Sequence, residues 1–532
     1  MYEISYAQFI DKTYGCWYGK CLGGAAGAPV EGIKDEIKVE DFTEIFNPDL
    51  PNDDLDIQLL WLETLEKKGA QITSCDLADA WIEKCWYPFS EYGYFMKNYM
   101  RGVKPPYSGI INNSFFKEGM GCPIRSEIWG IICAGNPEVA INYAYIDGCL
   151  DHADNSIYAE QFLAAVESMA FFENDILKLT EAGLTYIPIG SKLYCCLKMV
   201  LNEFKNQTDW QILRKRILNK YGHSDFTNVI QNMGIILIAL LYGNTDMRTT
   251  INIALKCGYD TDCTCASAAS IIGIIKGYSG LGDLKELIND YFVCGINVKR
   301  PSDSIKQLAE DTAAMALKIP NNKLFIMDKA NNHNELCIKC EYPTMDGLRK
   351  ALKSLEPVRW NIYGPYYNQL HQEINSDYPR PHGDSSVLPD LVCMVNNEAF
   401  LETDYPKGEK AYTINAYEDL IELDKYITMH GQYACVAETV IVSDKEQTVW
   451  AIVGNNDAFA LFVNDKNILQ KDEMRLWTPY NNFCLVNLNK GENHIKLKLL
   501  KRGEIFRFSI GFRCYTGEHW HKSKWCTDLK FR

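Results

Sequence analysis

Positive charge is scarce in this chain of 532 residues. Lysine and arginine together number 54 against 69 aspartate and glutamate residues, which gives a formal net charge of −15. No segment gathers Lys and Arg with aromatic residues as a nucleic-acid groove requires. We therefore expect no nucleic-acid partner, and an anionic ligand would need a cation supplied at its own site.

Long apolar runs are also missing. The longest candidate, residues 230–242, carries Gln231 and Asn232, whereas a membrane span needs about 18 or more apolar residues. Residues 1–5 show no basic stretch followed by an apolar one, so no secretory signal is expected. The 20 cysteines are then interpreted as reduced thiols of a cytoplasmic protein with no membrane partner.

The hydrophobic pattern changes along the chain. Apolar residues recur at helical spacing in 55–69, 159–172, 230–241 and 265–277. After about residue 340, short segments alternate as strands do, and turn residues separate them. These segments are 450–454, 459–463, 495–499 and 506–513. At this length several domains are expected.

The predicted fold class is multidomain α + β, with an all-α domain followed by a β-sandwich of jelly-roll type. The predicted limits are 1–320 for the helical domain, 321–400 for a connector and 401–532 for the sandwich.

Glycine recurs every fourth residue near the start, at Gly15, Gly19, Gly23 and Gly27. Inside a helix each glycine costs about 1 kcal/mol against alanine, so the spacing predicts close backbone packing against a neighbour. A second stripe of small residues comprises Ala266, Ala269, Ser270 and Gly273. A plain, tightly packed bundle explains both stripes equally well.

Two acidic clusters stand where a loop is predicted to become a helix. Asn52, Asp53 and Asp54 form the first, and Asp260 and Asp262 belong to the second. Hard cations such as Mg²⁺ bind carboxylate and amide oxygens, so two facing helices of this kind suit a two-magnesium site. Each cluster alone is also typical of a helix cap.

Glu31 follows the glycine-rich segment, two residues after Pro29. A carboxylate on such a turn is a candidate base toward a metal-bound water, and a solvated surface residue is the other interpretation.

Five separated motifs, in this order, resemble the ADP-ribosylglycohydrolases, the enzymes related to dinitrogenase reductase-activating glycohydrolase and to crystallin J1. The resemblance covers roughly residues 10–300. The motifs are Gly15–Gly32, Asn52–Asp54, Gly119–Arg125, Asp151–His152 and Gly258–Thr264.

The resemblance implies an all-α fold with two Mg²⁺ ions in a central cleft, where Mn²⁺ is also possible. It makes Asp53, Asp54, Asp260 and Asp262 metal ligands, with Asn52 at a position where the family has Thr or Ser. Glu31 falls on the family's catalytic glutamate. The residues that would shape the substrate pocket are Gly119, Met120, Gly121, Arg125, His152 and Asn155.

Two departures from the family pattern concern the metal site. Gly24 stands where the family usually has Asp, and Cys263 stands where it usually has Thr. Because a thiol is a poor Mg²⁺ ligand, Thr264 or water fills that role, or the second metal position is weaker.

By the resemblance, the ions would hold the cis-diol of a ribosyl group, and Glu31 would take a proton from the attacking water. The substrate would be a small-molecule or protein-linked ADP-ribosyl or ribosyl group, cleaved at an N- or O-glycosidic bond. Three alternatives remain open: hydrolysis of another glycosyl bond, a silent ligand-binding protein of the same fold, and a metal-dependent phosphohydrolase using Asp151 and His152.

The C-terminal region resembles the β-sandwich accessory modules of carbohydrate-active enzymes, which implies a carbohydrate-binding-like role. Trp477 and Tyr480 would stack on a sugar ring, and packing as core or interdomain aromatics is the alternative.

Overall fold

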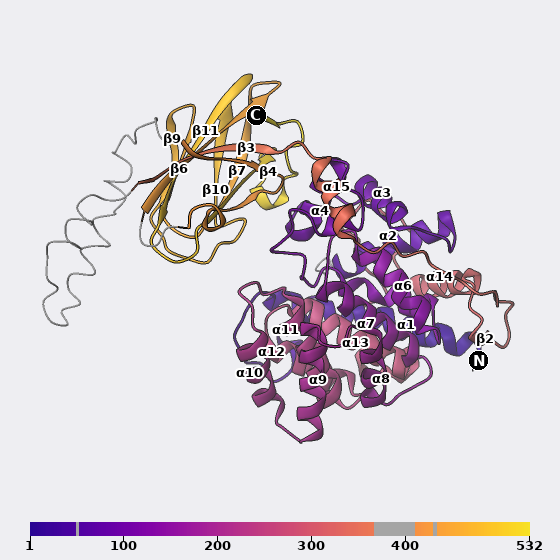
Figure 1. Cartoon of the computed structure of the whole chain (residues 1–532). Helices are drawn as coiled ribbons and strands as arrows, with labels where there is room; N and C mark the ends of the chain where they lie inside the picture. Colours follow the sequence, from indigo (N-terminus) through magenta and orange to yellow (C-terminus); the bar gives the residue numbers. More distant parts are fainter. Residues whose placement is uncertain (49–52, 367–409, 429–432) are drawn as a thin grey trace, which may run out of the picture. The chain divides into compact units, whose positions relative to one another are not determined.

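The chain forms two compact units in the computed structural model, which describes residues 1–48, 53–366, 410–428 and 433–532. The helical unit comprises Met1–Tyr87 and Lys104–Thr344, and the strand-rich unit comprises Pro88–Val103 and Met345–Arg532 (Figure 1). Within the described ranges, no helix has the length and apolar character needed to cross a bilayer.

The helical unit consists of α-helices joined by short 3₁₀ turns, with one small parallel pair of strands, β1 (Tyr2–Ile4) and β2 (Leu324–Ile326). In chain order its helices are α1 (Tyr6–Gly27), α2 (Asp53–Lys68), α3 (Ser74–Lys84), α5 (Ser126–Ile132), α6 (Pro137–Gly148), α7 (Asn155–Ala170), α8 (Ile176–Gly183), α9 (Lys192–Lys205), α10 (Trp210–Tyr221), α11 (Val229–Gly243), α12 (Met247–Cys257), α13 (Thr261–Lys276) and α14 (Ile305–Lys318). The four predicted helical segments coincide with α2, α7, α11 and α13, so these predictions are confirmed.

The glycine stripe of α1 packs against α13. A Cβ atom added at Gly23 would lie 2.4 Å from the carbonyl oxygen of Cys265, and one at Gly27 would lie 2.1 Å from that of Thr261. Gly15 and Gly19 face Gly273 and Ala269 in the same way. The two small-residue stripes are therefore each other's partners, and only hydrogen at these positions permits such close backbone contact.

This packing brings the end of α1 to the beginning of α13, because the contacts run in opposite chain directions along the two helices. The hydroxyl of Thr261 donates to the carbonyl of Gly27 at 2.8 Å. The loop after α1 is then held beside the second acidic cluster.

The strand-rich unit contains two antiparallel sheets. Among the described residues one sheet has the order β10-β7-β12-β5, and the other has the order β4-β3-β6-β11-β8-β9 with β13 also paired to β6. The strands are β3 (Val358–Tyr366), β4 (Lys410–Ala416), β5 (Leu420–Glu422), β6 (Tyr433–Ser443), β7 (Gln447–Asn455), β8 (Phe459–Val463), β9 (Lys466–Lys471), β10 (Asn482–Leu488), β11 (Gly491–Lys501), β12 (Arg507–Cys514) and β13 (Lys530–Phe531).

Alternate residues of both sheets enter one apolar core, as a sandwich requires. Trp360 of β3 and Phe508 of β12 meet in this core with ring centroids 5.1 Å apart. The predicted strands coincide with β7, β8, β11 and β12, which confirms the fold class.

Within the described ranges, two α-helices belong to the strand-rich unit, α4 (Ser90–Met100) and α15 (Met345–Lys353). Lys97 of α4 forms an ion pair with Asp419 at 2.5 Å, and Tyr94 packs on the ring of Trp525. A helix that precedes most of the helical unit in sequence is thus folded with the strands.

Candidate metal and active site

The loop after α1 is fastened to the loop before α13 by two backbone hydrogen bonds. The amide of Gly32 donates to the carbonyl of Tyr259 at 2.8 Å, and the amide of Tyr259 donates to the carbonyl of Ile33 at 2.7 Å. Gly258, with φ of +70°, leaves room for this contact, because a Cβ there would lie 2.6 Å from the Ile33 oxygen. Glu31 is positioned next to the start of α13 as a result.

Side chains of α2, of the start of α13 and of the loop after α1 converge in two groups that could hold a metal ion. Ligand atoms of Glu31, Asp260 and Asp262 lie within 4.8 Å of one another, and so do those of Asp54, Asp262 and Cys263. The two predicted acidic clusters therefore meet, and Asp262 is the residue common to both groups.

Asp260 precedes α13 at the N-cap position, yet its side chain makes no capping hydrogen bond. Within the described residues, Oδ2 of Asp260 and Oδ1 of Asp262 accept no hydrogen bond, although the residues are only 2% and 8% exposed. Buried carboxylate oxygens without donors are costly. A bound cation removes that cost, so this pair fits a metal better than it fits a helix cap.

The protonation of the site reflects its surplus of negative charge. The pKa of Glu31 is raised to about 8, first by the Asp262 carboxylate, then by desolvation of the Glu31 carboxyl group and by Asp54. Burial raises the pKa of Asp54 to about 7, and burial and Asp262 raise that of Asp260 well above its usual value. Glu31 is itself exposed, so the group opens to solvent at this residue.

Lys20 is a site residue that the sequence analysis did not identify. It is fully buried on α1, with Nζ 3.3 Å from Oδ2 of Asp54 and 2.9 Å from Oε1 of Glu127. Burial alone would lower the pKa of Lys20, but Asp54 and Glu127 raise it above its usual range. Lys20 is the one charged residue between Lys12 and Glu31, and that isolation was the available signal.

The predicted loop 119–125 is tied to this lysine. The carbonyl of Ile124 accepts hydrogen bonds from Lys20 Nζ at 2.8 Å and from Nε2 of Gln58 at 3.1 Å. Gln58 in turn donates to Glu127 at 2.8 Å. The far end of the loop and the first turns of α2 therefore share one buried polar network.

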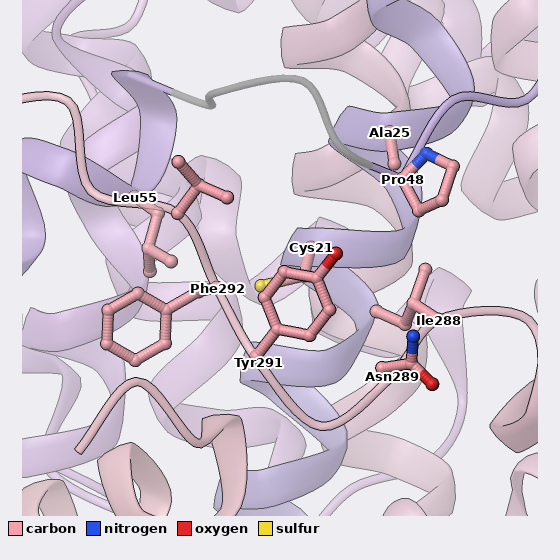
Figure 2. Close-up of a pocket in the computed structure, with 9 residues that line it drawn as sticks. Cys21, Ala25, Pro48, Leu55, Ile288, Asn289, Tyr291 and Phe292 are labelled. Carbon is pink, nitrogen blue, oxygen red and sulfur yellow. The ribbon is translucent and has the colours of Figure 1, made fainter.

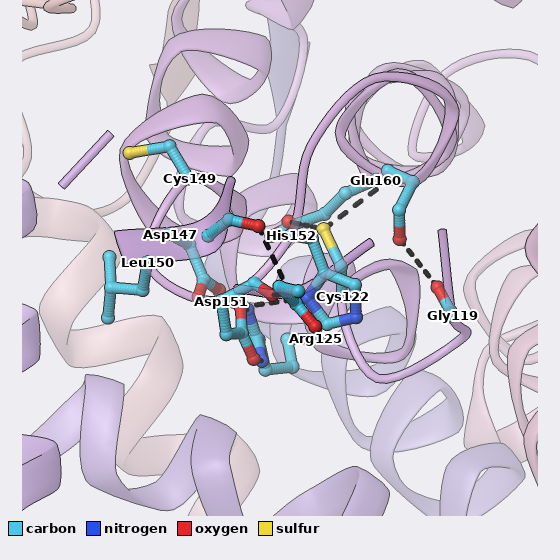
Figure 3. Close-up of polar contacts among 12 residues, drawn as sticks. Gly119, Cys122, Arg125, Asp147, Cys149, Leu150, Asp151, His152 and Glu160 are labelled. Atoms are coloured by element: carbon cyan, nitrogen blue, oxygen red, sulfur yellow. Dashed lines mark hydrogen bonds and ion pairs between the residues drawn. The ribbon is translucent and has the colours of Figure 1, made fainter. Parts of the chain in front are cut away.

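Arg125 lies in a second buried network, shown in Figure 3. Its guanidinium donates two hydrogen bonds of 2.9 Å to Asp151 and lies 2.9 Å from Oδ1 of Asp147. His152 Nδ1 lies 2.8 Å from Asp151. Burial would raise the pKa of Asp151, but Arg125 and His152 hold it at about 2. Arg125 and His152 are both fully buried.

The other predicted pocket residues also make internal contacts. Met120 is buried, the carbonyl of Gly119 accepts from the Ser156 hydroxyl at 2.5 Å, and Gly121 lies in the same loop. Asn155 donates to Glu118 at 2.5 Å and accepts from the amide of Leu193 at 3.0 Å.

The other predicted ligands are Asn52, Asp53 and Thr264. Asn52 lies outside the described residues, and Asp53 is the first residue of α2. The hydroxyl of Thr264 donates to the carbonyl of Thr261 at 3.4 Å, within α13.

Figure 2 shows a separate pocket, lined mainly by apolar residues including Cys21, Ala25, Leu55, Tyr291 and Phe292. Cys21 and Leu55 are the sequence neighbours of Lys20 and Asp54. Among the described residues, however, no carboxylate lines this pocket, so it is distinct from the metal groups.

In the strand-rich unit, the predicted sugar-stacking residues are half-buried. Trp477 donates to the hydroxyl of Ser509 at 3.2 Å, and Tyr480 stacks on Trp520 at 6.0 Å between ring centroids. Sugar binding by these residues stays a prediction.

Comparison with known proteins adds a family match. The model of the ADP-ribosylglycohydrolase family matches residues 5–321. No curated protein sequence matches the chain.

Similar solved structures include an ADP-ribosylglycohydrolase-related protein complex, with 18% identity and a TM-score of 0.40 over 58% of this chain and 97% of that chain. A β-glucosidase from Kluyveromyces marxianus in complex with glucose has 9% identity and a TM-score of 0.19 over 30% of this chain and 16% of that one. The PA14 domain of the MpAFP antifreeze protein has 11% identity and a TM-score of 0.19 over 31% and 85%. At these scores the structural likenesses carry no conclusion about function.

Proposed function

The chain belongs to the ADP-ribosylglycohydrolase family, and on that premise we propose that it hydrolyses a ribosyl N- or O-glycosidic bond with two divalent cations bound beside Glu31. The substrate class is an ADP-ribosyl or ribosyl group on a small molecule or a protein.

The pair of ligand groups that share Asp262 carries this proposal. Glu31, Asp54, Asp260 and Asp262 provide four negative charges when ionised, and two divalent cations provide four positive charges. Lys20 and Glu127 form an additional pair of opposite charge at 2.9 Å. The donor set is rich in oxygen, which suits Mg²⁺ or Mn²⁺.

When bound, such ions position hydroxyl groups and lower the pKa of a coordinated water. Glu31 is the member of the set that is exposed, so its carboxylate meets both substrate and water. It accepts a proton from the attacking water as positive charge develops on the anomeric carbon, and it then holds that proton on a carboxylate oxygen. Lys20 keeps the buried Asp54 carboxylate in place.

The Arg125 network has a positioning role in this proposal. Its guanidinium is paired with Asp147 and Asp151, so we assign it to supporting the 119–125 loop. The Ile124 carbonyl at the far end of this loop is held by Lys20.

The test is mass-spectrometric detection of released product. The purified chain with Mg²⁺ or Mn²⁺ is incubated with ADP-ribosylated peptides, ADP-ribose conjugates and simple ribosides, with and without EDTA. We expect release of ADP-ribose that is lost with EDTA and in Asp262→Asn. Glu31→Gln should lower turnover by about 100- to 10,000-fold.

Asp56→Asn is the matched control, because Asp56 is a buried carboxylate of α2 that hydrogen-bonds to Tyr87 and Gly295 and belongs to neither ligand group. It should retain activity. Release from a different glycoside would keep the chemistry and change the substrate. Absence of product from every substrate with both metals would contradict the proposed activity.

A further inference from the structure

The two cation positions have different donor atoms. Glu31, Asp260 and Asp262 offer oxygen alone, whereas Asp54, Asp262 and Cys263 include a sulfur. Sulfur is a strong ligand for borderline ions such as Zn²⁺ and Co²⁺ and a poor one for Mg²⁺.

Resting on the proposed function, we propose that Cys263 is a metal ligand and makes the Asp54–Asp262–Cys263 position selective for a thiophilic divalent ion, Zn²⁺ above all. The all-oxygen position keeps its preference for Mg²⁺ or Mn²⁺. The protein would then hold two unlike ions joined through Asp262.

The position of Cys263 in the fold supports this role. It lies in the first turn of α13, directly after Asp262, and is 7% exposed. Its Sγ lies 3.4 Å from Oδ1 of Asp54. Oδ2 of Asp54 faces Lys20 instead, at 3.3 Å. The oxygen beside the sulfur is therefore the one that points away from the ammonium group.

Asp262, the residue shared by both groups, has an unsatisfied oxygen, which points to a ligand beside it. Asp262 is more than nine-tenths buried, and Oδ1 accepts no hydrogen bond from any described residue. A metal ion among Asp54, Asp262 and Cys263 would satisfy it. As the metal–sulfur bond forms, the thiol proton leaves to the solvent, so each ion bound at this position releases one proton from Cys263.

The test replaces the native ion by Co²⁺, whose absorption reports its ligands. We expect the full chain to show a near-ultraviolet thiolate-to-cobalt band at saturation, together with visible ligand-field bands. The thiolate band should disappear in Cys263→Ser. It should persist in Cys265→Ser, the matched control, since the Cys265 thiol is buried two residues further on and contacts the carbonyl of Ile251 instead.

Zn²⁺ affinity separates the two positions. Changes to outer-shell partners alone cost about 10- to 100-fold in metal affinity. Loss of a direct ligand in Cys263→Ser should therefore weaken Zn²⁺ binding at least about tenfold, while Mg²⁺ binding stays within a factor of two or so.

X-ray absorption of the zinc-loaded wild-type protein needs no variant. We expect a sulfur shell at about 2.3 Å beside oxygen at about 2.0–2.2 Å. Oxygen alone, or cobalt ligand-field bands without a thiolate band, would overturn the role of Cys263 and leave the proposed hydrolase intact. Failure of every tested divalent ion to bind the wild-type chain would overturn both.

Discussion

The helical unit and the strand-rich unit treat buried charge in opposite ways. In the helical unit, carboxylates from α2, α13 and the loop after α1 lie beside one another, with Lys20 buried among them. The strand-rich unit fills the space between its sheets with one apolar cluster, and its pair Asp457–Arg502, half-buried at Arg502, lies at β-strand ends instead. Burying charge costs free energy that apolar packing does not. The proposed chemistry therefore belongs to the helical unit.

Compensation of that charge differs within the helical unit as well. Arg125 forms ion pairs with Asp147 and Asp151, so the carboxylates of that network have a cationic side chain beside them. Asp260 and Asp262 have no such cationic side chain among the described residues, and their free oxygens face the ligand groups. The contrast identifies the place where a cation from solution would complete the structure.

The largest expected effect comes from the shared ligand. Asp262→Asn should weaken both cation positions, and turnover should fall on the order of 10,000-fold, or about 5 kcal/mol. Asp457→Asn in the strand-rich unit should leave turnover unchanged. Calorimetric Mg²⁺ titration and product release measure the two quantities. Equal losses in both variants would contradict a site confined to the helical unit.

The next largest effect concerns stability. Arg125→Met leaves Asp147 and Asp151 buried without their cation, so it should destabilise the helical unit by about 3–5 kcal/mol. Arg502→Met breaks an ion pair that is partly exposed at Asp472, and it should destabilise the strand-rich unit by about 1–3 kcal/mol. Hydrogen exchange followed by mass spectrometry reports each unit separately. A larger loss in Arg502→Met would reverse the comparison.

A smaller effect is expected from the glycine stripe. Gly23→Ala places a methyl group 2.4 Å from a backbone oxygen of α13, and such overpacking costs about 1–3 kcal/mol. Turnover should fall as well, because the shift separates Glu31 from Asp262. Gly503→Ala, where nothing lies within 4 Å, is the control in the other unit. Thermal unfolding measures the stability of both variants, and product release measures their turnover. Unchanged stability and turnover in Gly23→Ala would show that the close contact between α1 and α13 is dispensable.

The sequence predicted those features that depend on local spacing. Helical periodicity predicted α2 and α13 closely enough to place both acidic clusters at helix starts, and the four-residue glycine spacing predicted the close contact of α1. Alternation predicted β11 and β12 for the same reason. Each signal lies within one element.

Features that depend on the choice of a distant partner were not predicted. Lys20 meets Asp54 and Glu127 only after three helices have packed, and nothing in the local pattern names those partners. Likewise, α4 has an ordinary helical sequence, while its partner Asp419 lies more than three hundred residues away. The pairing of Arg125 with Asp151, which turns a predicted pocket residue inward, is of the same kind.

Metal affinity is also expected to depend on pH. Glu31 and Asp54 have pKa values raised to about 8 and about 7, above the unfolded values of about 4. Their protonation favours the metal-free fold, so this stability is full below about pH 4 and is lost as the pH rises through 7 and 8. Cation binding needs both groups ionised. For each proton that binding displaces, Mg²⁺ affinity should therefore rise by up to about tenfold per pH unit between pH 6 and 8. Above pH 8 the affinity should level off.

Calorimetry in two buffers of different ionisation enthalpy counts the protons released on Mg²⁺ binding. Because Asp262 is the first cause of the raised pKa of Glu31, Asp262→Asn should lower that pKa and shift the pH profile of any remaining affinity to lower pH. In Glu31→Gln the change in Mg²⁺ affinity near pH 8 should vanish, while the change near pH 7, which comes from Asp54, should persist. A flat profile from pH 6 to 8 in the wild-type chain would show that the carboxylates are already ionised. Their surplus charge would then be compensated within the protein, as it is around Arg125, and the contrast between the two buried networks would be lost.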